Sequence, residues 1–188
     1  RPTFHGLPGL LADALPDRFG NRLIDAGRAS QGRPREDFSP IERLCYIGRR
    51  GIGALEFEPA LRGHQDETAV VDIAELVALA RDVLSERGGL ATDLGAGTKA
   101  LADILRVGTS AGGARAKAII AVNDATGEVR SGQLDAPPGF AHWLLKFDGV
   151  QDDALGDPAG YGRLEYAYHR MAVAAGVAMT ECRLLEEG

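Results

Sequence analysis

The chain has 188 residues, of which 45% are hydrophobic, and a formal net charge of −6. This length and apolar content are enough for the hydrophobic core of one large domain or two small ones. The negative net charge argues against a protein that binds nucleic acid unaided, because such proteins have a basic surface. The sequence shows no apolar run of transmembrane length and no signal-peptide pattern, so we expect a cytoplasmic protein without membrane contact. Cys45 and Cys182 lie far apart without zinc-ligand spacing, which favours two reduced thiols.

Short helices are predicted near the start of the chain. Apolar residues at helical spacing over residues 4–26, interrupted by Pro16, predict two of them. The stretch SPIE, residues 39–42, has the pattern of a capping box with proline at the first helical position. We expect the helix that begins there to end at Gly48.

The clearest predicted helix begins after Asp72 and carries the apolar stripe of an amphipathic helix. Asp72 is a favoured N-cap residue, Glu75 three residues later completes the capping pattern, and Gly88 is a typical helix end. A shorter helix is predicted over residues 98–108. The first half of the chain is therefore expected to be helical.

The apolar period changes from Ala116 onward, and strands are predicted in the second half of the chain. Short apolar runs separated by turn-forming residues such as Gly, Pro, Asn and Asp predict a hairpin of two strands, a third strand, a helix and a final strand. In chain order these elements are residues 117–123, 128–134, 141–149, 160–177 and 178–188. We place the boundary between the two parts between Ile104 and Ser110, and we expect an α+β protein with helices before this boundary and a sheet plus one helix after it.

Two glycine clusters invite a nucleotide-binding interpretation. The first, Gly95–Ala100, matches the dinucleotide-binding pattern GxGxxA, but that pattern requires a preceding strand in a βαβ unit, and residues 88–94 are a poor strand. A loop in which Thr98 caps the following helix is the favoured interpretation. A dinucleotide-binding oxidoreductase is therefore the least favoured function.

The second cluster lies in the stretch TSAGGARAKAII, residues 109–120. It fails the Walker A pattern, because alanine and arginine stand where Lys-Ser/Thr is required. Gly112 and Gly113 are followed by Arg115 and Lys117 and lead directly into a strand, as does the loop that covers the ATP phosphates in kinases. The alternative is a plain turn before a strand.

Lys146 and Glu165 add a second kinase-like feature. Lys146 stands in the otherwise apolar stretch HWLLKFD, where burial of an ammonium group is costly unless an anion meets it. In protein kinases a strand lysine contacts the phosphates and a glutamate from the next helix orients it, and Glu165 comes at that place in chain order. The alternative is a lysine at a strand edge and a glutamate that faces water.

The four histidines have neither HExxH spacing nor a Ser/Asp companion, so they predict no metal site or triad.

Together these stretches resemble HipA-type serine/threonine protein kinases, the toxin half of HipBA type II toxin–antitoxin modules. The resemblance covers nearly the whole chain, and the motifs occur in the family's order. The stretches that carry it are GLPGLLADALPDRFGNRLID, SPIERLCYIGRRGIGALEFEP, TSAGGARAKAII, HWLLKFD and GRLEYAYHRMAVAAGVAMTECRLL.

The resemblance implies a nucleotide site with residues in specific roles. Lys146 is implied to be the ATP-binding lysine and Glu165 its helix partner. Ser110 falls where the family carries an autophosphorylated loop serine, whose modification inactivates the kinase. The residues implied for the ATP-phosphate loop are Gly112, Gly113, Ala114, Arg115, Ala116 and Lys117.

The resemblance also implies a fold, cofactors and partners. Residues 1–104 look like the helical part of the family's N-terminal subdomain, and residues 105–188 look like the β-rich N-lobe of a kinase fold related to phosphatidylinositol kinases. Family members bind ATP and Mg²⁺ and phosphorylate protein serines, such as those of aminoacyl-tRNA synthetases. They associate with a HipB-like DNA-binding antitoxin, so contact with DNA is expected to be indirect.

The sequence departs from the family pattern at both ends. The family's N-terminal β-barrel segment is not represented ahead of Arg1, and its catalytic-base and Mg²⁺-binding aspartates belong to a C-terminal lobe that follows the matched region. We therefore expect a kinase fragment, with no catalytic residue of its own and no phosphotransfer. The alternative is a non-catalytic HipA-like module that serves as an interaction or regulatory surface.

Overall fold

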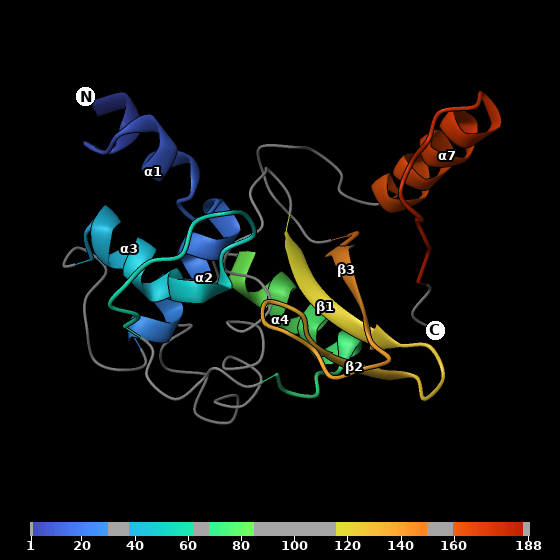
Figure 1. The fold of residues 1–188 in the computed structure, drawn as a ribbon, viewed down its shortest axis with the longest axis horizontal. Coiled ribbons are helices and arrows are strands. Elements are labelled where there is room, and N and C mark those ends of the chain that lie inside the picture. Colours follow the sequence, from blue (N-terminus) through green and yellow to red (C-terminus); the bar gives the residue numbers. More distant parts are fainter. Residues whose placement is uncertain (1, 30–37, 62–67, 85–115, 150–159, 186–188) are drawn as a thin grey trace.

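The computed structural model describes residues 2–29, 38–61, 68–84, 116–149 and 160–185. In Figure 1 the helices of residues 2–50 lie to the left of a small sheet, the helix of residues 73–84 overlaps the sheet in this view, and the last helix lies apart at the right. The architecture is α+β, as predicted, and none of the helices in the described ranges has the length and apolar content needed to span a membrane. The helix predicted over residues 98–108 and the boundary predicted between Ile104 and Ser110 lie outside these ranges.

The N-terminal region consists of short helices. A 3-10 turn, Pro2–Phe4, precedes α1 (Gly9–Asp13), and a proline-containing turn separates α1 from α2 (Arg18–Ala29). The start of α2 is capped by a carboxylate, because Asp17 Oδ1 accepts a hydrogen bond from Gly20 N at 2.7 Å. The prediction of two helices is therefore confirmed.

The next helix, α3 (Pro40–Ile47), begins with the predicted capping box. Glu42 N donates a hydrogen bond to Ser39 Oγ at 3.3 Å, and Ser39 N donates one to Glu42 Oε2 at 2.8 Å. The helix ends at Gly48, whose φ of 57° is costly for residues with a side chain. A 3-10 turn, Gly48–Arg50, follows.

The clearest predicted helix is α4 (Ile73–Leu84), and its cap is also as expected. Glu75 N donates a hydrogen bond to Asp72 Oδ1 at 3.0 Å. Just before the helix, Val71 N donates a hydrogen bond to Val129 O at 3.0 Å. This bond ties the start of α4 to the sheet.

The sheet has three antiparallel strands within the described residues, in the order β2-β1-β3. β1 (Lys117–Asn123) and β2 (Glu128–Ser131) form the predicted hairpin, and β3 (Ala141–Lys146) pairs with the other edge of β1. In this register Lys117 lies directly opposite Lys146. The beginning of β1 and the end of β3 therefore meet at one end of the sheet.

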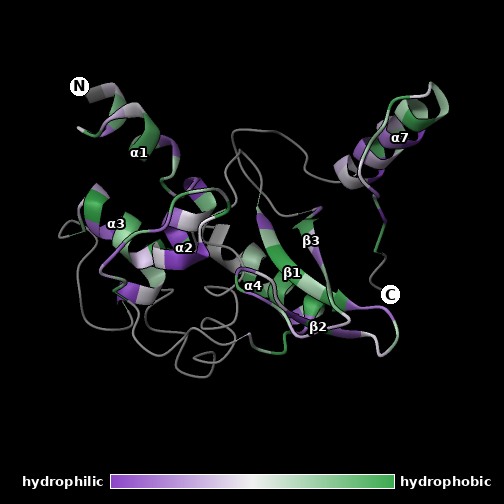
Figure 2. Cartoon of the chain, viewed as in Figure 1, coloured by the Kyte–Doolittle hydropathy of each residue, from purple (hydrophilic) through white to green (hydrophobic). Residues whose placement is uncertain are grey.

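One hydrophobic core joins the helices to the sheet. Leu23 and Ile24 from α2 and Ile120 from β1 are almost completely buried in it. Phe19 packs edge-on against Phe147, with ring centroids 6.5 Å apart. Figure 2 shows hydrophobic residues on β1 and α4, two of the elements that contribute to this core. Segments from both halves of the chain therefore pack together.

Gly132, at the end of β2, packs closely against β1. A Cβ atom at this position would lie 2.5 Å from the carbonyl carbon of Ile120 and 2.6 Å from its oxygen, so the two backbones would have to separate. We therefore expect Gly132→Ala to lower the free energy of unfolding by about 1–3 kcal/mol, measured by urea denaturation. Gly9→Ala is the matched control, since a Cβ there meets no atom within 4 Å. Equal stability of the Gly132 variant and the parent chain would contradict this packing.

The last helix, α7 (Tyr161–Ala174), is confirmed, but none of its residues is buried. Leu164, Tyr168 and Met171 are 50%, 63% and 63% exposed. The strand predicted after this helix is wrong, because the described residues 177–185 form no strand. The contacts of this segment with the sheet are made by a side chain rather than by a backbone ladder.

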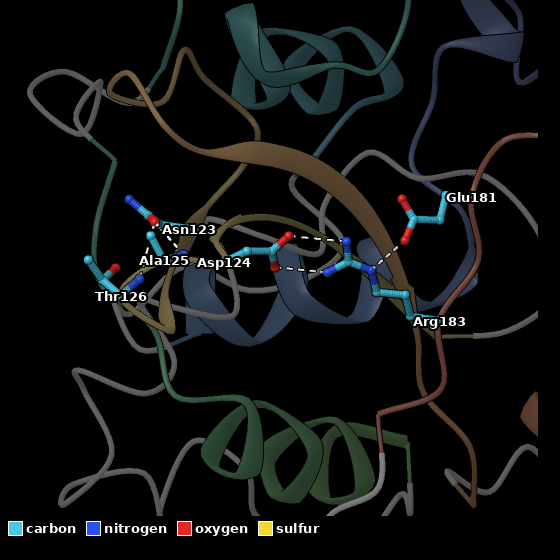
Figure 3. Close-up of polar contacts among 6 residues, drawn as sticks. All are labelled: Asn123, Asp124, Ala125, Thr126, Glu181 and Arg183. Carbon is cyan, nitrogen blue, oxygen red and sulfur yellow. Dashed lines mark hydrogen bonds and ion pairs between the residues drawn. The ribbon is translucent and has the colours of Figure 1, made fainter.

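That side chain is Arg183, which binds the turn between β1 and β2 (Figure 3). Its guanidinium donates hydrogen bonds to both carboxylate oxygens of Asp124 at 2.8 and 3.1 Å, and another to Glu181 at 2.8 Å. It also lies 4.4 Å from the centre of the Trp143 ring on β3. Within the turn, the Asn123 side chain accepts hydrogen bonds from two backbone N–H groups. These contacts hold the C-terminal segment beside the hairpin.

We expect Asp124→Asn to release this segment without unfolding the sheet. The hydrogen bonds from Arg183 lower the pKa of Asp124 below its ordinary value of 3.8. A lowered pKa means that the contact is fully present above the ordinary value and is lost as the pH falls through the lowered one. At neutral pH the Asp124 carboxylate is charged and binds Arg183, whereas asparagine carries no charge. Trypsin should therefore cleave after Arg183 faster in the variant than in the parent chain. Asp135→Asn, at another exposed aspartate, is the control, and equal cleavage in all three proteins would contradict the contact.

Candidate functional site

The two lysines predicted to bind nucleotide phosphates lie side by side. Lys117 begins β1 and Lys146 ends β3, and residues directly opposite each other in an antiparallel pair have side chains on the same face. Each lysine has a carboxylate beside it, Asp17 next to Lys117 and Glu165 next to Lys146. We call these four residues the lysine–carboxylate cluster. The carboxylates offset the repulsion between two like charges on adjacent strands.

Lys146 and Glu165 form a half-exposed ion pair. Lys146 Nζ donates a hydrogen bond to Glu165 Oε2 at 2.5 Å, and the two side chains are 44% and 47% exposed. Lys146 is the last residue of β3, which is an edge strand among the described residues, so its side chain reaches solvent while an anion, Glu165, also meets it. An exposed pair stabilises a protein by about 1 kcal/mol or less. Because Lys146 is half-exposed and an ammonium group has three N–H donors, it can donate to a second anion while it remains bound to Glu165.

Lys117, by contrast, is buried. Its Nζ lies 3.8 Å from Asp17 Oδ2, and both side chains are 8% exposed. Burial lowers the pKa of Lys117 and raises the pKa of Asp17, while the charge of each partner opposes the shift of the other. The Lys146 ammonium further lowers the pKa of Lys117, and the Glu165 carboxylate raises it. The four groups are thus close enough to influence one another.

Asp17 is the member of the cluster that sequence reasoning missed. An aspartate directly before a helix is a common N-cap, and Asp17 accepts such a bond from Gly20 N at the start of α2. No local sequence pattern indicates its contact with Lys117. α2 fixes Asp17 in place, because the cap orients its carboxylate and the neighbouring Phe19 packs against Phe147 in the core. The N-terminal helices therefore support the strand ends that carry the lysines.

The other predicted loop residues divide into two groups. Ala116 is buried, and its carbonyl accepts a hydrogen bond from Phe147 N at 3.2 Å, which extends the β1–β3 pairing next to the cluster. The remaining predicted positions lie outside the described residues. They are Ser110, Gly112, Gly113, Ala114 and Arg115, and the stretch Gly95–Ala100 also lies outside them.

No other part of the described structure brings the predicted site residues together. A cavity of about 610 Å³ lies between the start of α2 and α3 and is lined by Arg18 and Arg43, but it includes no member of the lysine–carboxylate cluster. Arg43 is already bound there to Asp25 at 2.6 Å. Within the described residues, no group of three or more His, Cys, Asp or Glu side chains is arranged to hold a metal ion.

Two family models, one for each of two HipA domains, match the chain. Residues 109–188 match the HipA-like C-terminal domain, and residues 1–58 match the HipA N-terminal domain. The first match begins with the glycine-containing stretch and includes Lys117, Lys146 and Glu165, and the second includes Asp17. No curated protein and no solved structure gives a significant match.

Proposed function

The chain belongs to the HipA-type toxin–antitoxin proteins, and on this premise we propose that it is the ATP-binding part of a HipA-like serine/threonine kinase. The observation that supports this function best is the Lys146–Glu165 ion pair beside Lys117, at one end of the sheet. The proposal divides the chain into a helical N-terminal subdomain, residues 1–104, and the N-lobe of a kinase core, residues 105–188.

The chemistry of the cluster suits a polyphosphate. Two ammonium groups on one face of a β-ladder present several N–H donors to anionic oxygens, and hydrogen bonds between charged groups are among the strongest in proteins. In the sequence, Gly112 and Gly113 come shortly before Ala116, so their backbone N–H groups are the natural additional donors. ATP, bound with Mg²⁺, supplies the phosphoryl group for transfer. We assign no Mg²⁺ ligand to the described residues.

Each residue of the cluster has a distinct role in this proposal. Lys146 contacts the phosphates, and Glu165 orients Lys146. Lys117 supplies a second positive charge, and Asp17 keeps that charge in place where burial opposes it. Ser110 is the proposed site of regulatory autophosphorylation. A HipB-like antitoxin is the proposed partner, and a serine on another protein, such as an aminoacyl-tRNA synthetase, is the proposed substrate.

Titration of the chain with ATP, ADP and AMP by isothermal calorimetry tests the proposal. If the lysines hold the terminal phosphates, ATP binds most tightly and AMP most weakly. A single charged hydrogen bond contributes about 1.5–3 kcal/mol, so loss of the terminal phosphates should weaken binding by roughly tenfold or more. Equal affinity for the three nucleotides would contradict a phosphate site at the lysines.

A second candidate function, a non-catalytic interaction module, is favoured by the surface of α7. Tyr168 and Met171 on this helix are each 63% exposed, and exposed apolar groups on one helix face are typical of contact surfaces. This function predicts that a HipB-like antitoxin binds the chain although none of the three nucleotides does. The two candidates therefore differ in a single set of titrations.

A further inference from the structure

We propose that Asp148 is the positioning residue that holds Glu165 against Lys146. Asp148 follows Lys146 by two residues, and its carboxylate reaches the start of α7. Asp148 Oδ2 accepts a hydrogen bond from Gly160 N at 3.0 Å, and Oδ1 accepts one from Tyr161 N at 3.2 Å. The consequence of this contact for nucleotide binding rests on the proposed function, whereas the contact itself does not.

The start of α7 needs such a partner. The first N–H groups of a helix have no acceptor within the helix, and Gly160, at the N-cap position, has no side chain to supply one. The positive end of the helix dipole also favours a carboxylate there. Asp148 therefore acts as the cap of α7, although it lies at the end of the preceding strand and not next to the helix in the sequence.

This contact also decides where α7 lies. None of the residues of α7 is buried, so burial of apolar side chains does not fix the helix against the sheet. Gly162, in the first turn, lies beside the same carboxylate, since a Cβ atom there would be in ordinary van der Waals contact with Asp148 Oδ2 at 3.4 Å. A polar attachment at the first turn therefore replaces the packing that usually orients a helix.

The geometry transmits the position of Asp148 to Glu165. Phe147 points into the core toward Phe19, so its neighbours Lys146 and Asp148 are free to face α7. Glu165 follows Tyr161 by four residues and lies one turn further along the same face of the helix. With Tyr161 N bound to Asp148, Glu165 is presented to Lys146.

The rate at which Lys146 is acetylated by sulfo-NHS-acetate, followed residue by residue by mass spectrometry, tests this role without any nucleotide. A lysine amine held by a carboxylate reacts more slowly than one without a partner. Glu165→Gln should therefore raise the rate at Lys146 several-fold, and Asp148→Ala should raise it to the same extent. Lys117 should keep its slow rate in both variants, because it is buried beside Asp17. Asp135→Ala is the control for loss of an exposed carboxylate and should change neither rate.

The double variant separates positioning from a general structural role. If Asp148 acts through Glu165, adding Asp148→Ala to Glu165→Gln produces no further increase at Lys146. An additional increase, or an unchanged rate in Asp148→Ala alone, overturns the proposal. Asp148→Asn keeps one side-chain carbonyl as an acceptor and should restore part of the protection. This variant decides the question if circular dichroism shows that Asp148→Ala is unfolded, and an unprotected Lys146 in a folded Asp148→Asn then overturns the proposal.

Failure of this inference and failure of the proposed function give different results. If the acetylation pattern is as expected but ATP does not bind the parent chain, Asp148 positions Glu165 and the proposed function is wrong. If ATP binds and Asp148→Ala weakens binding as much as Glu165→Gln does, both proposals hold. If ATP binds and the acetylation of Lys146 does not respond to Asp148→Ala, only the positioning role is overturned.

Discussion

Replacement of Lys146 by alanine is expected to weaken ATP binding by roughly 10- to 100-fold while the fold remains intact. The proposed contact with the phosphates is a hydrogen bond between charged groups, whose loss costs about 1.5–3 kcal/mol. The fold should survive because Lys146 and Glu165 are 44% and 47% exposed, and such ion pairs contribute little to stability. Calorimetric titration measures the affinity, and urea denaturation measures the stability.

Arg170→Ala provides the control for this experiment. Arg170 is an exposed cation on the same helix as Glu165, and its guanidinium donates a hydrogen bond to Tyr166 Oη at 3.4 Å. Its loss removes the same amount of positive charge without touching the lysine–carboxylate cluster. If Arg170→Ala and Lys146→Ala weaken ATP binding equally, the effect is one of net charge, and Lys146 has no specific role.

Replacement of Lys117 by methionine is expected to lower the free energy of unfolding by roughly 3 kcal/mol at neutral pH. The side chains of Lys117 and Asp17 are each 8% exposed, so the substitution leaves a buried carboxylate without its counter-charge. Because burial raises the pKa of Asp17, the contribution of this group to stability is fully present at low pH and is lost as the pH rises through the raised value. The deficit of the variant should therefore shrink on acidification.

The double variant Asp17→Asn/Lys117→Met should recover most of the lost stability. It removes both buried charges, and replacement of an entire buried ion pair by neutral groups is often close to neutral. Asparagine also caps helices well, so it should keep the hydrogen bond from Gly20 at the start of α2. Urea denaturation of the parent chain, both single variants and the double variant completes the thermodynamic cycle. If Lys117→Met alone costs nothing, the two charges are not buried together.

Local patterns predicted much of the fold. The capping box at Ser39 and the cap at Asp72 marked two helix starts, because each depends on residues three positions apart. The turn between β1 and β2 likewise depends on a short run of residues, and the hairpin lies where it was expected. Lys146 and Glu165 were expected to be close because of their order along the chain, and the structure brings them together.

Contacts between distant segments were not predictable in the same way. The sequence stretches around Lys117 and Lys146 are both apolar, and which lysine is buried depends on which strand is central. Among the described strands β1 is central and β3 is at the edge, and Lys117 is buried whereas Lys146 is half-exposed. The prediction of a final strand was wrong because it also depended on a contact between distant segments. Arg183 binds Asp124 through side chains, and residues 177–185 form no strand.

The most direct test of the nucleotide site is labelling with an acyl-phosphate derivative of ATP. A lysine amine close to the bound phosphates attacks the acyl carbonyl and releases ATP, and mass spectrometry then identifies the acylated lysine. The chain contains only three lysines, Lys99, Lys117 and Lys146. The proposed site predicts acylation at Lys146, or at Lys117 beside it, that excess ATP suppresses. Acylation of Lys99 to the same extent as Lys117 and Lys146, with no suppression by ATP at any of the three lysines, would contradict a phosphate site in the lysine–carboxylate cluster.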